Sequence, residues 1–267
     1  MNIYIYQHLG LGDMISNNGL IRYLIEINSQ AKSFYIFFKK MHTKSIRFMF
    51  RDLKKIKIVP VTNDTKNEKK EVDNYLKKIK KKDYEIIKIG HDFYHPTGKL
   101  NPDFLKNPWH CTINFYKQFG VPYSYRFKKT FWKRDNNSEK KLLKKLAGKE
   151  KNFIFVHDDI KRNLKIDTSK LDKNFTIIRN DEKNFIFDYG LILEKAKEIH
   201  LIESSVRQLW ETLNIKTKKL FLYKDDRDDY SMTLYNKKSK KMFGSSKKWK
   251  EIKLSNIKKT KNFLKFL

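Results

Sequence analysis

Residues 3–25 read IYIYQHLGLGDMISNNGLIRYLI, and this stretch sets the architecture expected for the N-terminal half. The apolar run at residues 3–6 indicates a buried strand, and the turn GLGD at residues 10–13 follows it. Met14 and Ile21 then fall on one face of a helix. A strand that passes through a glycine turn into a helix is typical of the first part of a β-α-β unit.

The alternation of strands and helices continues along both halves of the chain. In the first half we expect strands at residues 34–38, 56–61 and 84–89 and helices at 42–50, 69–80 and 102–119, the last broken near Pro108. In the second half we expect strands at residues 152–156, 175–178, 199–202 and 219–223 and helices at 139–146, 189–197 and after 203–205. Strands separated by helical segments imply right-handed crossovers and mostly parallel sheets.

The expected fold class is α/β, with two Rossmann-like lobes whose mostly parallel sheets face a cleft. Residues 121–137 are aromatic and basic without a clean period, so we place the boundary near residue 130. The N-terminal lobe is then residues 1–130 and the C-terminal lobe residues 131–235. Residues 236–267 form a lysine-rich basic tail that we expect to be helical.

The composition favours an anionic partner without naming one. The formal net charge is +30, from 60 Lys and Arg against 30 Asp and Glu, although an AT-rich genome produces a similar bias. One cysteine, Cys111, allows no intrachain disulfide and no thiolate metal cage, which fits a reducing cytoplasm. We expect no signal peptide and no membrane span, because no apolar run approaches ~18 residues.

The glycine turn is the first of two segments that carry chemistry. Gly10 and Gly12 allow a tight turn and close approach by a ligand, and free N–H groups at the helix start attract anions. The spacing matches neither the dinucleotide fingerprint nor a P-loop. The alternatives are that the glycines form only a turn and that Asp13 is only a favourable charge in the first helical turn.

The second segment is IHLIESSVRQ at residues 199–208, again a strand that runs into a helix start. The hydroxyls of Ser204 and Ser205, with nearby backbone N–H groups, are suited to hold a diphosphate. The alternative is that they only cap the helix, with Ser205 and Gln208 at capping-box spacing. Ligands of open α/β sheets bind outside the carboxyl ends of the strands, so we expect both segments to line one interdomain cleft.

Two stretches of the chain resemble a known family. Residues 8–24, HLGLGDMISNNGLIRYL, resemble the opening of the heptosyltransferase-like (family 9-type) glycosyltransferases of the GT-B fold, with matches at Gly10, Gly12, Asp13, Arg22 and Leu24. Residues 199–213, IHLIESSVRQLWETL, resemble the later strand, polar turn and serine-rich helix start of that family. Between these stretches the match rests on the order of strands and helices.

The resemblance implies transfer of a sugar, with inversion, from a nucleotide diphosphate donor on the C-terminal lobe to an acceptor hydroxyl on the N-terminal lobe. It implies no cofactor and no metal, because cationic side chains and a helix N-terminus offset the charge of the leaving diphosphate. Asp13 matches the family's proposed general base, with acceptor positioning or turn capping as the alternative; its place at a helix start tends to lower its pKa, which burial would have to counter. His8 and Arg22 fall on the acceptor side.

Further residues are assigned to the donor side of the resemblance. Lys161 and Arg162 follow a strand, and an ammonium or a guanidinium fork suits phosphate oxygens. A chance pair is the alternative in a chain with 60 basic residues. We also assign donor contacts to His157 and Arg207 for phosphate and to Glu203 for ribose hydroxyls. For His157, an ordinary histidine at a strand end is the alternative.

The expected partners are a sugar nucleotide and a glycan or glycolipid acceptor, and the basic tail is a candidate for peripheral contact with an anionic membrane at its inner face. A sugar-nucleotide binder without catalysis stays open, as does a nucleic-acid-binding protein. We do not expect nucleic acid, since no motif of a known reader is present. Neither zinc at His91, His95 and His110 nor calcium at residues 225–229 is expected from the spacing.

Overall fold

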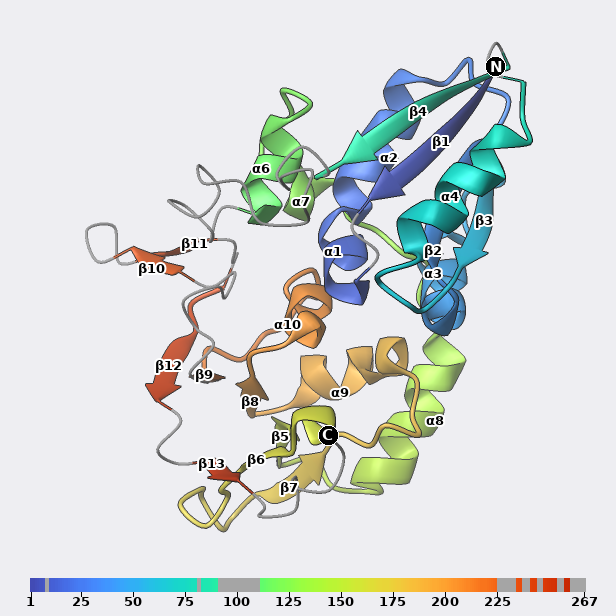
Figure 1. Ribbon diagram of the computed structural model, residues 1–267. Helices are drawn as coiled ribbons and strands as arrows, with labels where there is room; N and C mark the ends of the chain where they lie inside the picture. Colours follow the sequence, from blue (N-terminus) through green and yellow to red (C-terminus); the bar gives the residue numbers. More distant parts are fainter. Residues whose placement is uncertain are drawn as a thin grey trace. The chain divides into compact units, whose positions relative to one another are not determined.

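The computed structural model describes residues 1–7, 10–80, 83–90, 111–224, 234–236, 241–243, 247–253 and 257–259. The chain divides into two compact units, Met1–Lys133 and Arg134–Leu267. Each unit contains one parallel sheet with helices in the connections between its strands (Figure 1). This confirms the α/β class with two Rossmann-like units. The cleft between the two sheets stays a prediction.

The first unit is built on a four-stranded sheet in the order β3-β2-β1-β4. Its strands are β1 (Asn2–Gln7), β2 (Phe34–Lys39), β3 (Ile56–Val61) and β4 (Tyr84–Ile89), and all neighbouring pairs are parallel. Each forms where an apolar run predicted it, and Ile5 and Phe37 are fully buried. Since the strand order reverses between β1 and β4, the carboxyl end of β1 lies at the usual ligand-binding position of such a sheet.

Seven helical segments of the described residues connect or flank these strands. They are α1 (Leu11–Ser16), α2 (Asn18–Ile27), η1 (Lys40–His42), α3 (Thr43–Phe50), α4 (Glu68–Lys77), α6 (Cys111–Lys117) and α7 (Tyr125–Lys128). The single helix expected after the glycine turn is wrong, because it is interrupted at Asn17. The break expected near Pro108 lies outside the described residues.

The second unit is built on a five-stranded sheet in the order β12-β9-β8-β5-β7, again with parallel neighbours. Its strands are β5 (Phe153–His157), β7 (Thr176–Arg179), β8 (Glu198–Ile202), β9 (Leu220–Lys224) and β12 (Lys250–Lys253). The helical segments are α8 (Asn136–Ala147), η5 (Ile160–Arg162), η6 (Ile186–Tyr189), α9 (Gly190–Lys195) and α10 (Ser205–Trp210). The order reverses between β5 and β8, so their carboxyl ends form the switch point of this sheet.

The tail contributes strands where we expected a helix. β12 pairs with β9, and β13 (Ile257–Lys259) pairs antiparallel with β6 (Leu164–Ile166), a strand that we did not expect. β10 (Leu234–Asn236) and β11 (Lys241–Phe243) pair with each other. The helical tail is therefore wrong for these described residues. The physical reason at β12 is burial, because Ile252 packs against a core cluster that contains Ile154 and Tyr223.

No helix among the described residues is long and apolar enough to cross a membrane.

Candidate active site

The turn after β1 places Asp13 in the first turn of α1. Gly10 is the N-cap residue in an extended conformation, and its carbonyl accepts the N–H of Met14 at 3.1 Å. A Cβ atom on Gly10 would lie 3.1 Å from Oδ2 of Asp13, so the carboxylate folds back over the turn. Gly12 lies inside the helix with an ordinary negative φ. His8, assigned to the acceptor side, lies outside the described residues.

Asp13 has the electrostatic character of a general base. Its side chain is half-buried, and burial raises its pKa from 3.8 to about 7. No hydrogen-bond donor or cation of the described residues contacts the carboxylate. The lowering expected at a helix start is therefore outweighed by desolvation. A carboxylate that exchanges its proton near neutral pH is well suited to accept one from a hydroxyl.

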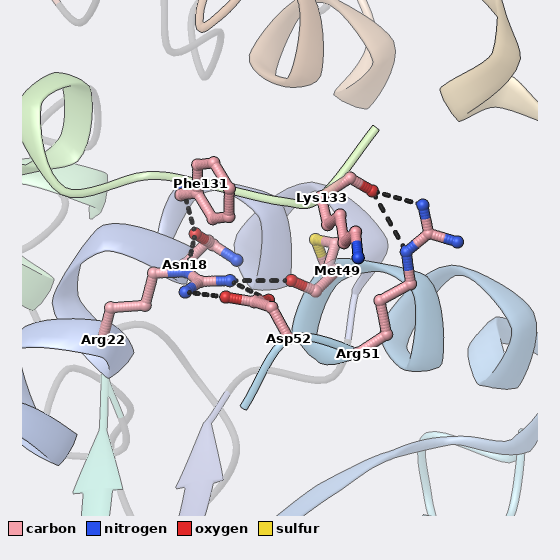
Figure 2. Close-up of polar contacts among 7 residues, drawn as sticks. All are labelled: Asn18, Arg22, Met49, Arg51, Asp52, Phe131 and Lys133. Atoms are coloured by element: carbon pink, nitrogen blue, oxygen red, sulfur yellow. Dashed lines mark hydrogen bonds and ion pairs between the residues drawn. The ribbon is translucent and has the colours of Figure 1, made fainter. Parts of the chain in front are cut away.

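Arg22 is partly buried in the first unit, where several polar groups contact its guanidinium (Figure 2). Its guanidinium makes a two-pronged ion pair with Asp52, at 2.9 Å and 2.8 Å, and donates to the carbonyl of Met49 at 3.0 Å. Its Nε donates to Oδ1 of Asn18 at 3.2 Å, and the ring of Phe131 lies 5.2 Å from the guanidinium carbon. This geometry favours a structural role that joins α2 to α3 over the acceptor contact implied by the resemblance.

The same region fixes the segment that ends the first unit. Oδ1 of Asn18 accepts the backbone N–H of Phe131 at 3.0 Å. Arg51 donates from Nε and Nη2 to the carbonyl of Lys133, at 3.1 Å and 2.5 Å (Figure 2). The backbone is therefore hydrogen-bonded to α2 and α3 up to the last residue of this unit.

Buried polar groups surround the break between α1 and α2. Nδ2 of Asn17 donates to Oε1 of Gln7 at 2.9 Å, and both side chains are fully buried. The hydroxyl of Tyr116 donates to the carbonyl of Ser16 at 2.9 Å and accepts the N–H of Leu20 at 3.2 Å. Sequence reasoning missed Tyr116, because the partners are about a hundred residues apart. A buried asparagine inside an apolar helical pattern was the available signal.

In the second unit, His157 ends β5 and is buried. Its ring packs edge-on against Trp210, with the ring centroids 5.2 Å apart. Burial lowers its pKa to about 4, so the imidazole is neutral at physiological pH. Its Nδ1 has no hydrogen-bond partner in the described part of the chain. His157 therefore offers no positive charge for a phosphate, and its unpartnered Nδ1 is buried.

Arg162 fastens the loop after β5 to the end of β8. Its Nε donates to Oδ2 of Asp159 at 2.6 Å, and its Nη2 donates to the backbone carbonyl of Glu203. The structure thus brings together two segments that we assigned to one ligand. The neighbouring Lys161 is exposed, and no hydrogen bond or ion pair from the described residues engages it. Its ammonium group is therefore accessible to an anion.

Helix α10 is capped by Ser204. Its Oγ accepts the backbone N–H of Val206 at 3.3 Å. The capping box expected to begin at Ser205 is wrong, because Ser205 is already the first helical residue. The side chain of Ser205 lies outside the described part of the structure.

Arg207 is an internal residue, and its contacts favour a structural role over the phosphate contact that we predicted. Its side chain is fully buried, and its Nε donates to both carboxylate oxygens of Glu203 at 3.0 Å. Its Nη1 donates to Oε1 of Glu211 at 2.9 Å, and the same oxygen accepts Nε1–H of Trp249 at 2.7 Å. This ion triad stabilises α10. Because Glu203 is bound to Arg207, the geometry favours a structural role for its carboxylate over a ribose contact.

Metal-binding clusters are absent from the part of the chain that the structure describes: no group of three or more His, Cys, Asp or Glu side chains is placed to hold an ion. His91, His95, His110 and the acidic run at residues 225–229 lie outside that part.

Comparison with known proteins identifies a structural likeness. No family model matches the chain, and no curated protein sequence matches it. The chain is similar to the crystal structure of a glycosyl transferase family 9 protein from Veillonella parvula, with a TM-score of 0.55 and 7% identity over 94% of this chain and 86% of that chain. The two chains share a fold. At this identity the likeness shows the fold alone.

Proposed function

We propose that this chain is a glycosyltransferase that moves a sugar from a nucleotide diphosphate donor to an acceptor hydroxyl. The observation that carries the proposal is the placement of Asp13. Its carboxylate follows the strand at the switch point of the first sheet and has a pKa of about 7. The fold shared with a glycosyl transferase family 9 protein supports this reaction over other uses of such a carboxylate.

We place the donor on the second unit, at the carboxyl ends of β5 and β8. Three features support this assignment: the exposed ammonium of Lys161, the start of α10 at Ser204, and the contact of Arg162 that holds the two loops together. A cation and helical N–H groups stabilise the negative charge that develops on a leaving diphosphate. The proposal therefore includes a metal-independent reaction.

The proposed chemistry is a direct displacement. The acceptor oxygen forms a bond to the anomeric carbon while the bond from that carbon to the diphosphate oxygen breaks, and the electron pair leaves with the diphosphate. Asp13 takes the proton of the acceptor hydroxyl as the new bond forms. Attack on the face opposite the leaving group inverts the anomeric centre.

The proposal is tested by isothermal titration with a panel of nucleoside diphosphates and sugar nucleotides. We expect at least one of them to bind at a single site, and Lys161→Ala to weaken that binding roughly tenfold. Lys165→Ala is the matched control, because Lys165 is also exposed and lies four residues further along, in β6. Failure of every compound to bind, or equal losses in the two variants, would contradict the assignment.

A further inference from the structure

The hydroxyl of Tyr116 lies between two helices that the sequence pattern would join. Tyr116 belongs to α6, its side chain is fully buried, and its ring packs edge-on against Tyr123 with centroids 5.5 Å apart. The hydroxyl donates to the carbonyl of Ser16 at 2.9 Å and accepts the N–H of Leu20 at 3.2 Å. The hydroxyl therefore uses its donor and one acceptor lone pair at the junction of α1 and α2.

Ser16 and Leu20 are four residues apart, which is the pair that hydrogen-bonds directly in a continuous α-helix. A side chain inserted between such a pair opens the ladder and bends the helix. The bend is held from the other side as well, because Asn17 at the break donates to Gln7 at the end of β1, at 2.9 Å. The junction is thus fixed to α6 and to the sheet.

Asp13 lies one turn before this junction. The N–H of Asn17 bonds to the carbonyl of Asp13 at 2.8 Å. Helix α1 has only six residues, so its direction is determined where it meets α2. The position of the half-buried Asp13 carboxylate relative to α2 and the sheet therefore depends on how α1 meets α2 at Asn17.

We propose that Tyr116 is a positioning residue for Asp13: its inserted hydroxyl keeps α1 and α2 separate at Asn17 and so holds the carboxylate in its half-buried place. The catalytic consequence rests on the proposed function, whereas the positioning itself does not. Without the hydroxyl, the amide of Leu20 can bond directly to Ser16, and α1 then continues the axis of α2. Asp13 moves with it, out of its half-buried place.

The test is a titration of the Asp13 carboxyl group by carbon-13 NMR, with the signal assigned by Asp13→Asn. In Tyr116→Phe, which keeps the ring, we expect the pKa of Asp13 to fall by about one unit or more toward the ordinary value. Tyr189→Phe is the matched control, because it removes a buried hydroxyl that accepts an N–H at 2.9 Å in the second unit. That variant should leave the titration of Asp13 unchanged.

A second variant guards against misfolding of the first. Asn17→Ala removes the bond to Gln7 and favours a continuous helix, so it should shift the titration in the same direction. Unchanged titration of Asp13 in both folded variants would overturn the positioning role. If the titration shifts but sugar transfer does not fall, the positioning role stands and the proposed function of Asp13 fails. A fall in kcat with unchanged donor affinity supports both.

Discussion

Oδ2 of Asp13 lies 3.1 Å from the place that a Cβ atom on Gly10 would occupy. This distance is shorter than an ordinary van der Waals contact. A side chain at position 10 would therefore crowd the Asp13 carboxylate. The sequence GLGD thus places a glycine where the Asp13 carboxylate folds back over the start of its own helix, and the glycine leaves room for it.

Replacement of Gly10 tests this relationship. Gly10→Ala should displace the Asp13 carboxylate and lower kcat roughly tenfold or more, because small displacements of a catalytic group are costly. Donor affinity should stay unchanged, since the donor is assigned to the second unit. Gly120→Ala is the control for general destabilisation, because its φ is +63° and nothing lies near its Cβ position. Steady-state kinetics of the two variants provide the comparison, and equal kcat values would refute the relationship.

The raised pKa of Asp13 predicts a pH-dependent effect on stability. At pH values between 3.8, the ordinary pKa of an aspartate, and about 7, the folded chain holds a proton on Asp13 that the unfolded chain has released. The fold therefore loses stability as the pH rises through this range. Asp13→Asn should therefore be more stable than the wild type at about pH 8, by up to about 4 kcal/mol, and equally stable at about pH 4.

Urea unfolding of both proteins at each pH measures this difference. His157 contributes with the opposite sign, because burial lowers its pKa to about 4 and stability is lost as the pH falls toward that value. Comparison of variant and wild type at the same pH cancels this contribution. An advantage of the variant that does not grow with pH would exclude the raised pKa.

Arg22 is predicted to stabilise the first unit without binding a ligand. Burial raises the pKa of Asp52. The hydrogen bond and the charge of Arg22 lower this pKa by more, so the net pKa of Asp52 lies below its ordinary value. Arg22→Met should lower the unfolding free energy by about 1–3 kcal/mol and leave nucleotide affinity unchanged. Arg47→Met, an exposed position on the neighbouring α3, is the control. A selective loss of acceptor binding in the folded Arg22 variant would restore its assignment to the acceptor.

Arg207 is predicted to matter for the fold of the second unit. Arg207→Met leaves the fully buried Glu211 without its ion pair and should cost about 3–5 kcal/mol. Addition of Glu211→Gln should recover part of this loss, because the uncompensated charge is removed. Chemical unfolding of the single and double variants measures the recovery. A stable single variant with lost nucleotide affinity would support the phosphate contact instead.

Every strand of the two parallel sheets except β12 was readable from the sequence, because buried parallel strands are apolar runs such as residues 34–38 and 152–156. Gly10 and Asp13 were also readable from the sequence, because they lie three residues apart and their contact is local. The edge strand β12 was missed because four residues with one apolar side chain carry no helix or strand period. Its pairing partner β9 alone makes it a strand.

The roles of charged residues were less readable than the strands. Glu203, Arg207 and Glu211 are spaced four residues apart, which indicates ion pairs along one helix face, but the spacing does not say whether that face is buried. The contact of Arg22 with Asp52 spans thirty residues. The break at Asn17 depends on a hydroxyl about a hundred residues away, so no local pattern contains it.

The most direct measurement is the release of nucleoside diphosphate from the sugar nucleotide that binds tightest, with a mixture of glycan acceptors present. The wild type should release the diphosphate in step with sugar transfer. Asp13→Asn should bind the same donor with unchanged affinity and release its diphosphate at least about a hundredfold more slowly. Release by Asp13→Asn at the wild-type rate would contradict a glycosyl transfer that uses this carboxylate as its base.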